Sequence, residues 1–138
     1  LATCTIPANT LSAAGDGLRV LFLAHTAANG NNKQLRVRVG GLAGTLVIDS
    51  TALAANNLNI WASNSSLVQR LASTTATVYA GILTDANATG TAAVSAFQST
   101  LRGASITWTS ANDLVITGTT PTASGDLTLD TYIIEVLQ

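Results

Sequence analysis

Two residues in this sequence have the chemistry of a nucleophilic enzyme site: the single histidine, His25, and the single cysteine, Cys4. A Ser-His-Asp triad would have to be built on His25, and a cysteine nucleophile would need His25 as its base. His25 follows the apolar run at residues 18–24, and no G-x-S-x-G nucleophile elbow occurs in the chain. We therefore interpret His25 as a structural residue at a strand end and Cys4 as an incidental thiol, and we predict no enzymatic activity.

Metal binding and acid–base catalysis find little support in residue spacing. Residues 85–90 match the first half of a calcium-binding loop, with oxygen-bearing side chains at alternate positions before a glycine. The twelfth position of that loop, where a bidentate glutamate should close the site, is Ala96. The same residues are common turn formers, and the seven acidic residues are too scattered to choose a carboxylate pair for glycoside hydrolysis. We predict neither a metal nor a cofactor.

Three basic residues and two tryptophans are the candidate contact residues. Lys33, Arg36 and Arg38 are half of the six basic residues, and the two arginines share one face of a predicted strand. They could contact an acidic partner or a polysaccharide, but we favour a solvated face that protects a sheet edge from pairing. The two tryptophans, together with Tyr79 and Tyr132, could stack on sugar rings if exposed. In a chain with only two each of Trp, Tyr and Phe, we expect them to be core or interface anchors.

Scarce charge is the main feature of the composition. A length of 138 residues fits one domain, residues 1–138, and only 9% of residues are charged, against about 25% in an average soluble domain. Weakly charged surfaces tend to associate, so we infer that much of this surface contacts protein. Six basic against seven acidic residues also disfavour nucleic acid as a partner. No apolar run approaches the length of about 18 residues that a membrane span needs, so we expect no membrane contact.

The start of the chain is unusual because the sequence contains no methionine, so Leu1 is not an initiator residue. We expect a processed product, a domain cut from a longer protein, or a sequence with an incomplete start. A preceding segment, if one exists, could carry the attachment to a partner.

Short apolar stretches rich in β-branched residues alternate with turn clusters of Gly, Asn, Ser and Asp, a pattern typical of an all-β sandwich or barrel. The clearest strand is residues 33–39, where Leu35, Val37 and Val39 alternate with polar residues, which predicts one buried face. Residues 17–25 are apolar on both faces, which predicts a central strand or one at a subunit contact. The other predicted strands are 45–49, 58–63, 77–83, 93–98, 105–109, 113–117 and 127–137.

These nine candidate strands are close in number to the eight of a double-sheet jelly roll. We therefore predict an antiparallel, jelly-roll-like β-sandwich of about eight strands. Residues 65–71 and 86–96 would also suit a helix, but their β context leads us to predict both as non-helical. The apolar final stretch, residues 127–137, predicts that the carboxyl-terminal strand is paired inside a sheet.

Three stretches resemble jelly-roll modules of tailed-bacteriophage virion proteins. Residues 5–12, TIPANTLS, and residues 15–20, GDGLRV, are similar to an opening of the form PANTL…GD.LR. Residues 26–41, TAANGNNKQLRVRVGG, resemble the FAANxNNKxxRxxxGG stretch of those modules. Residues 126–129, DLTL, and 133–137, IIEVL, resemble their terminal strand. Together these stretches cover about the first third and the last tenth of the chain.

The resemblance implies a β-sandwich on the virion surface, usually a homotrimer, of the kind found in fibre modules and head-decorating proteins. The matching motifs are turns and strand ends, so no catalytic residues transfer. We therefore expect a non-enzymatic structural protein on the particle surface, in contact with its own copies and other virion proteins. The compact size favours capsid decoration over a fibre head.

Two other functions remain open. One is a receptor-binding module, at a fibre tip or in a secreted adhesin, that recognises host-surface glycan with Trp61 or Trp108 as a stacking platform. The other, which the low charge equally permits, is a self-assembling surface-layer subunit.

Overall fold

The structure of the chain, a computed structural model, describes residues 2–27, 29, 31, 33–49, 60–72, 76–87, 98–119 and 125–138. All regular elements in this part of the chain are β-strands. They are β1 (Ala2–Ile6), β2 (Gly17–Thr26), β3 (Gln34–Val39), β4 (Thr45–Asp49), β5 (Ile60–Arg70), β6 (Ala76–Asn87), β7 (Gln98–Ser105), β8 (Asn112–Thr119) and β9 (Leu127–Leu137).

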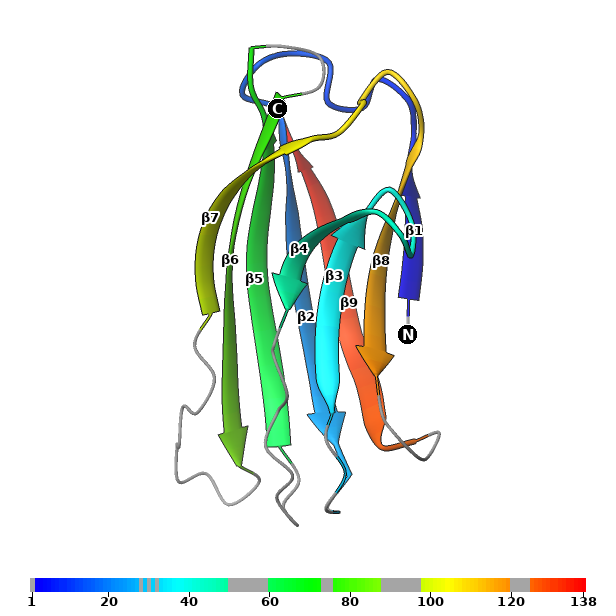
Figure 1. Ribbon diagram of the computed structural model, residues 1–138, viewed down its shortest axis with the longest axis vertical. Coiled ribbons are helices and arrows are strands. Elements are labelled where there is room, and N and C mark those ends of the chain that lie inside the picture. The colour runs from blue at the N-terminus through cyan, green and yellow to red at the C-terminus, as the bar shows by residue number, and fades with distance from the viewer. Residues whose placement is uncertain are drawn as a thin grey trace.

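The strands form two antiparallel sheets that face each other as a β-sandwich (Figure 1). One sheet has the order β1-β8-β3-β4 and the other the order β7-β6-β5-β2-β9. The chain changes sheet after β1, β2, β4, β7 and β8, so strands that neighbour each other in space are often far apart in sequence. The predicted all-β antiparallel sandwich is confirmed.

Most of the strands predicted from alternation are present. The predicted strands at 45–49 and 127–137 coincide with β4 and β9, and the one at 33–39 contains β3. The prediction that residues 65–71 are not helical is confirmed, because β5 continues through them to Arg70. The remaining predicted strands that overlap observed ones are 17–25 with β2, 58–63 with β5, 77–83 with β6 and 113–117 with β8.

Two predictions of local structure differ from the structure. The predicted strand at 105–109 is wrong, because β7 ends at Ser105 and the alternating Ile106 and Trp108 insert into the core from a loop and turn. Strand β1 was not predicted, although ATCTI alternates apolar residues with threonine and its burial follows that alternation. Residues 88–97, which contain most of the predicted strand at 93–98, lie outside the described residues.

The core lies between the two sheets and follows the two-residue period of the strands. In β3, Leu35, Val37 and Val39 are buried while the residues between them are half-buried, as predicted. In β2, the apolar side chains from Val20 to Ala24 alternate between buried and half-buried, and β2 lies between β5 and β9. The prediction of a central strand is therefore confirmed for β2.

The turn before β2 is closed by the side chain of Asp16. Its Oδ2 accepts hydrogen bonds from the backbone N–H groups of Ser12 (2.8 Å) and Ala13 (2.7 Å). Its backbone carbonyl accepts a hydrogen bond from the N–H of Arg70, and the Arg70 guanidinium donates to the carbonyl oxygen of Leu11 at 2.8 Å. The Gly-Asp motif thus fixes the loop after β1 against the end of β5.

The Gly-Gly motif after β3 is also structural. Gly40 and Gly41 have φ angles of 94° and 82°, a region that disfavours residues with a Cβ atom. Both N–H groups donate to the backbone carbonyl of Asp113, at 2.9 and 3.0 Å. At Gly44, an added Cβ would lie 2.2 Å from the carbonyl oxygen of Val39. The β3–β4 turn therefore needs glycine for conformation at two positions and for space at a third.

Candidate interaction surface

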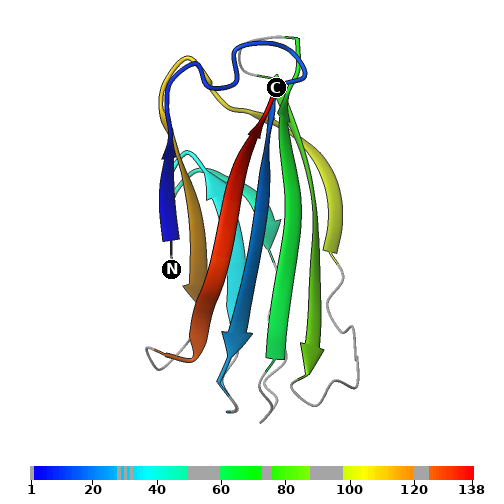
Figure 2. The same cartoon turned by 180° about the vertical axis from the view of Figure 1, so that it is seen from behind.

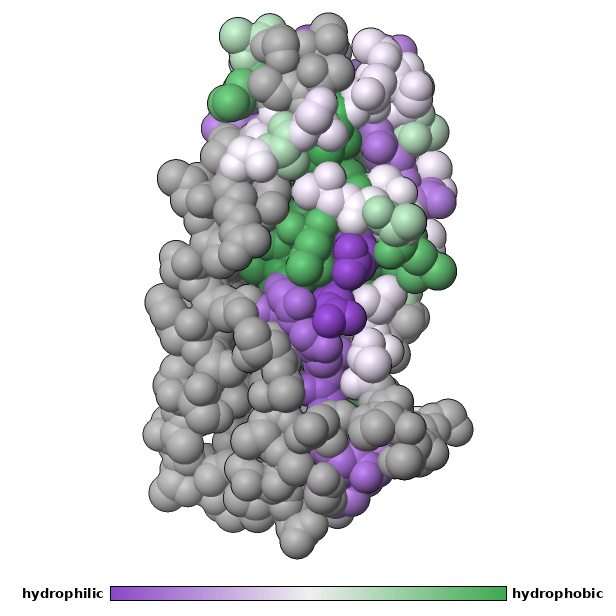
Figure 3. Space-filling model, viewed as in Figure 1, coloured by the Kyte–Doolittle hydropathy of each residue, from purple (hydrophilic) through white to green (hydrophobic). Residues whose placement is uncertain are grey.

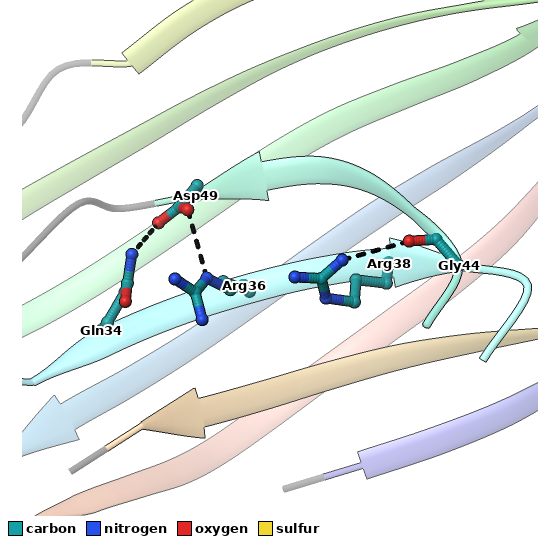
Figure 4. Close-up of polar contacts among 5 residues, drawn as sticks. All are labelled: Gln34, Arg36, Arg38, Gly44 and Asp49. Atoms are coloured by element: carbon teal, nitrogen blue, oxygen red, sulfur yellow. Dashed lines mark hydrogen bonds and ion pairs between the residues drawn. The ribbon is translucent and has the colours of Figure 1, made fainter. Parts of the chain in front are cut away.

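The two arginines of β3 lie on the outer face of the four-stranded sheet, where they are held by neighbouring groups. The Nε of Arg36 donates to Oδ2 of Asp49 at 3.1 Å, and Gln34 donates to the other carboxylate oxygen (Figure 4). Arg38 donates from its guanidinium to the backbone carbonyl of Gly44 at 3.1 Å. The outer face of β3 is therefore a row of polar side chains anchored to β4 and to the β3–β4 turn.

The interpretation of this row as protection for a sheet edge is wrong, because β3 lies between β8 and β4 and is not an edge strand. Figure 3 shows hydrophilic residues along the middle of this face beside a small hydrophobic area. Arg36 and Arg38 are half-buried, and the charge of Arg36 is paired with Asp49. The row is thus a partly neutralised polar surface.

Lys33 does not belong to this surface, because its residue is only 2% exposed. Its Nζ donates to the backbone carbonyls of Ala27 (3.1 Å) and Asn29 (3.0 Å) and to Oδ1 of Asn29 (2.6 Å). Three oxygen acceptors around one ammonium group satisfy its hydrogen-bonding capacity. The prediction of Lys33 as a contact residue fails because the loop before β3 folds over its side chain.

Lys33 belongs to a buried polar group that we call the Asp126 cluster: Asn29, Asn31, Lys33 and Asp126. The carboxylate of Asp126 accepts hydrogen bonds from Nδ2 of Asn29 and Nδ2 of Asn31, both at 2.7 Å. The bonds from Asn31 and Asn29, with the charge of Lys33, hold the pKa of Asp126 below its ordinary value of 3.8, against the opposing effect of burial. The cluster joins the β2–β3 loop to the turn before β9, so its role is structural.

The structure describes the side chain of Trp108 but only the backbone of Trp61. Trp108 is 2% exposed, and its Nε1 donates to Oγ1 of Thr77 at 2.9 Å. The expectation of a core anchor is confirmed for Trp108, which has no ring face available for a sugar. The backbone of Trp61 lies in β5 opposite His25 of β2, and its side chain is outside the described part.

His25 and Cys4 lie in different sheets, His25 on β2 and Cys4 on β1. Nδ1 of His25 is 2.9 Å from both carboxylate oxygens of Asp130 on β9. Cys4 is half-buried and packs against the core. The structure therefore places these two residues in separate structural roles and does not bring them together as a nucleophile and base.

Among the exposed apolar side chains of β9, sequence reasoning named only Tyr132. Four of its large apolar side chains are exposed: Tyr132 (43%), Ile133 (51%), Val136 (45%) and Leu137 (39%). We call these four residues the β9 strip. The expectation that this strand is paired inside a sheet holds on one side only, since β9 pairs with β2 but forms the edge of the five-stranded sheet. The sequence of β9 has apolar residues at both odd and even positions. This was the signal that could have indicated apolar side chains on both faces of the strand.

The β9 strip has apolar side chains on both faces of its strand. Ile133 lies opposite Leu21 on the outer face of the sheet, whereas Tyr132 lies opposite the buried Phe22 on the core face. Tyr132 and Val136 stay exposed on the core face because the sandwich is open along this side. The edge strands β1 and β9 lie on the same side of the molecule (Figures 1 and 2).

The acidic residues of β9 are both paired within the chain. Glu135 forms an ion pair with Arg19 across β2 and β9, and Asp130 bonds to His25. Asp130 is the extra residue of a β-bulge, because Leu23 pairs with Thr131 and the next residue of β2 pairs with Leu129. The β9 strip therefore lies C-terminal to the bulge, in a segment without an uncompensated charge.

No protein family, curated protein or solved structure matches this chain. Within the residues described, no group of three or more His, Cys, Asp and Glu side chains could hold a metal ion. The same part of the chain contains no helix long and apolar enough to cross a membrane.

Proposed function

We propose that this chain is a non-enzymatic structural protein of a tailed-phage virion, a homotrimeric module on the particle surface that serves as capsid decoration or as a fibre head. The observation that carries the proposal is the β9 strip, four exposed apolar side chains on an edge strand of a chain with only 9% charged residues. Exposed apolar edge strands pair or aggregate unless they are covered. A protein that functions within a permanent assembly has its neighbours to cover them.

The winding of the chain supports the jelly-roll-like part of the proposal. β2 pairs with β9 and β3 pairs with β8, so the first and last parts of the chain form two nested antiparallel pairs that cross from one sheet to the other. β4 and β7, the next two strands inward, lie in different sheets and do not pair with each other. The nested pairs that connect the first and last parts of the chain are therefore β2 with β9 and β3 with β8. We propose a jelly-roll-like winding on this basis.

The positions of the resembling motifs also support the proposal. Asp16 closes the turn before β2, the Asp126 cluster joins two loops, and Gly40 with Gly41 forms the turn after β3. Each motif residue holds backbone in place and is satisfied by groups of its own chain. Such roles fit a module whose motifs maintain a scaffold.

The glycan-binding alternative is weakened by Trp108, whose ring is buried and bonded to Thr77. It is weakened further by Lys33, which is occupied inside the Asp126 cluster. Arg36 and Arg38 are anchored to β4 and its turn, which leaves less freedom to bind an anionic sugar.

Light scattering and electron microscopy test the proposal. Multi-angle light scattering of the purified chain at micromolar concentration should give the mass of three chains, and a clean monomer would overturn the proposal. A gold-labelled antibody against the chain should decorate intact particles of the phage that encodes it. Label on the head favours capsid decoration, label on fibres favours a fibre head, and particles without label would contradict the virion location.

A further inference from the structure

We infer that the β9 strip is the contact between copies of this chain, and that β9 lies beside the rotation axis of the assembly. The inference rests on the proposed function, since it names the surface through which the structural module associates. It commits to one occupant of the strip, a second copy of the same chain.

The length of β9 matches the size of such an interface. β9 has 11 residues, all of which lie along the edge of the five-stranded sheet. At roughly 3.3 Å per residue the strand is about 36 Å long. A standard interface removes about 800 Å² from each partner, which corresponds to a patch roughly 30 Å across. The segment after the bulge, Thr131 to Leu137, is about 23 Å long at the same rise and spans most of such a patch.

The exposure of both faces determines how the second copy must approach. Ile133 is exposed on the outer face of the sheet, and Tyr132 and Val136 are exposed on the core face. A partner that lay flat on the outer face would leave Tyr132 and Val136 in water. A partner that approaches edge-on, at the open side between β1 and β9, covers both faces (Figure 2).

The charges beside the strip select the kind of partner. Glu135 is neutralised by Arg19, so a basic partner would have to displace the Arg19 guanidinium from this carboxylate. A weakly charged apolar surface meets no such competition, and this chain supplies one, with a net charge of -1. Rotational symmetry places identical strips near one another at the axis. The Arg19–Glu135 ion pair then keeps the Glu135 carboxylates of the copies from repelling one another.

The β-bulge limits the contact to the second half of β9. The extra residue at Asp130 interrupts the regular edge, and bulges are a common way to prevent edge-to-edge pairing. Thr131 to Leu137 have no such interruption in their pairing with β2. The exposed apolar residues of β9 all lie in this uninterrupted segment.

A charged substitution in the strip tests the inference, with a matched substitution elsewhere. Ile133→Glu places a carboxylate in the contact and should weaken association at least about 100-fold, seen as a shift toward monomer in light scattering over a dilution series. Leu42→Glu is the control, because Leu42 is 72% exposed and lies in the β3–β4 turn of the other sheet. It should leave the association unchanged. Far-UV circular dichroism checks that both variants remain folded.

Cysteine cross-linking gives a second test that does not require destabilising the assembly. In a Cys4→Ser background, Ile133→Cys should form disulfide-linked pairs on mild oxidation, because residues beside a rotation axis meet their own copies. Leu42→Cys in the same background should stay unlinked.

The outcomes separate the two proposals. A monomeric wild-type chain overturns the proposed function and the inference together. A wild-type oligomer that Ile133→Glu does not weaken, or in which Ile133→Cys stays unlinked, overturns the inference alone. Equal weakening by Ile133→Glu and Leu42→Glu also overturns it, because the effect would not be specific to β9.

Discussion

The ammonium group of Lys33 donates a 2.6 Å hydrogen bond to Oδ1 of Asn29, and Nδ2 of the same asparagine donates to Asp126 at 2.7 Å. Asn29 thus connects the cation and the carboxylate of the cluster through the two ends of one amide. The arrangement joins segments almost one hundred residues apart, the β2–β3 loop and the turn before β9. Stability measurements can show how much this connection contributes to the fold.

We expect Lys33→Met to lower the free energy of unfolding by about 2 to 3 kcal/mol, because it removes three hydrogen bonds donated by a buried ammonium group. Urea denaturation followed by tryptophan fluorescence measures the change. Arg36→Met, three residues further along the chain in β3, is the matched control. It removes a partly exposed ion pair with Asp49 and should cost about 1 kcal/mol or less. Equal effects of the two variants would contradict the role of the cluster.

The lowered pKa of Asp126 predicts a loss of stability in acid. A carboxyl group whose pKa is lower in the folded state stabilises the fold above its unfolded pKa, near 3.8, and loses that contribution as the pH falls through the lower folded value. Wild type should therefore be more stable than Asp126→Asn at pH 7, and the difference should shrink below about pH 4. Urea titrations at several pH values measure it. Asn31→Ala, which removes the largest cause of the shift, should reduce the acid-dependent loss.

The burial of Trp108 predicts a large effect of its removal. Trp108→Ala should destabilise the fold by about 3 to 5 kcal/mol, because it leaves a cavity in the core and removes the hydrogen bond to Thr77. Thermal unfolding followed by circular dichroism measures this loss, and Leu42→Ala should stay within about 0.5 kcal/mol of wild type. In a Trp61→Phe protein, the remaining Trp108 emission should be poorly quenched by acrylamide. Strong quenching would show that the ring is accessible.

The β3–β4 turn offers a comparison of two glycines. Gly41→Ala meets no atom within 4 Å but forces alanine to a φ of 82°, which should cost about 1 to 2 kcal/mol. Gly44→Ala places a Cβ 2.2 Å from the carbonyl oxygen of Val39, so the backbone has to move, at a cost of about 3 kcal/mol. Denaturation curves of both variants show which substitution lowers the free energy of unfolding more. A Gly44→Ala protein as stable as Gly41→Ala would show that the turn relaxes freely.

Local alternation predicted the strands well because burial in a sheet has a period of two residues. Leu35, Val37 and Val39 of β3 are buried as the pattern required, and β4 and β9 have the predicted bounds. The prediction at residues 105–109 failed for the same reason, since Ile106 and Trp108 alternate and are buried, yet their backbone is not a strand. Alternation reports burial, and burial does not require a strand.

The sequence by itself therefore determined the all-β class, most strands, and a surface with little charge. Only the tertiary structure decided that Lys33 is enclosed by the β2–β3 loop, that β3 is interior, and that β9 is an edge. These properties depend on which strands become neighbours. β9 pairs with β2 across more than one hundred residues, as in Leu18 with Val136, and no local pattern encodes such a choice.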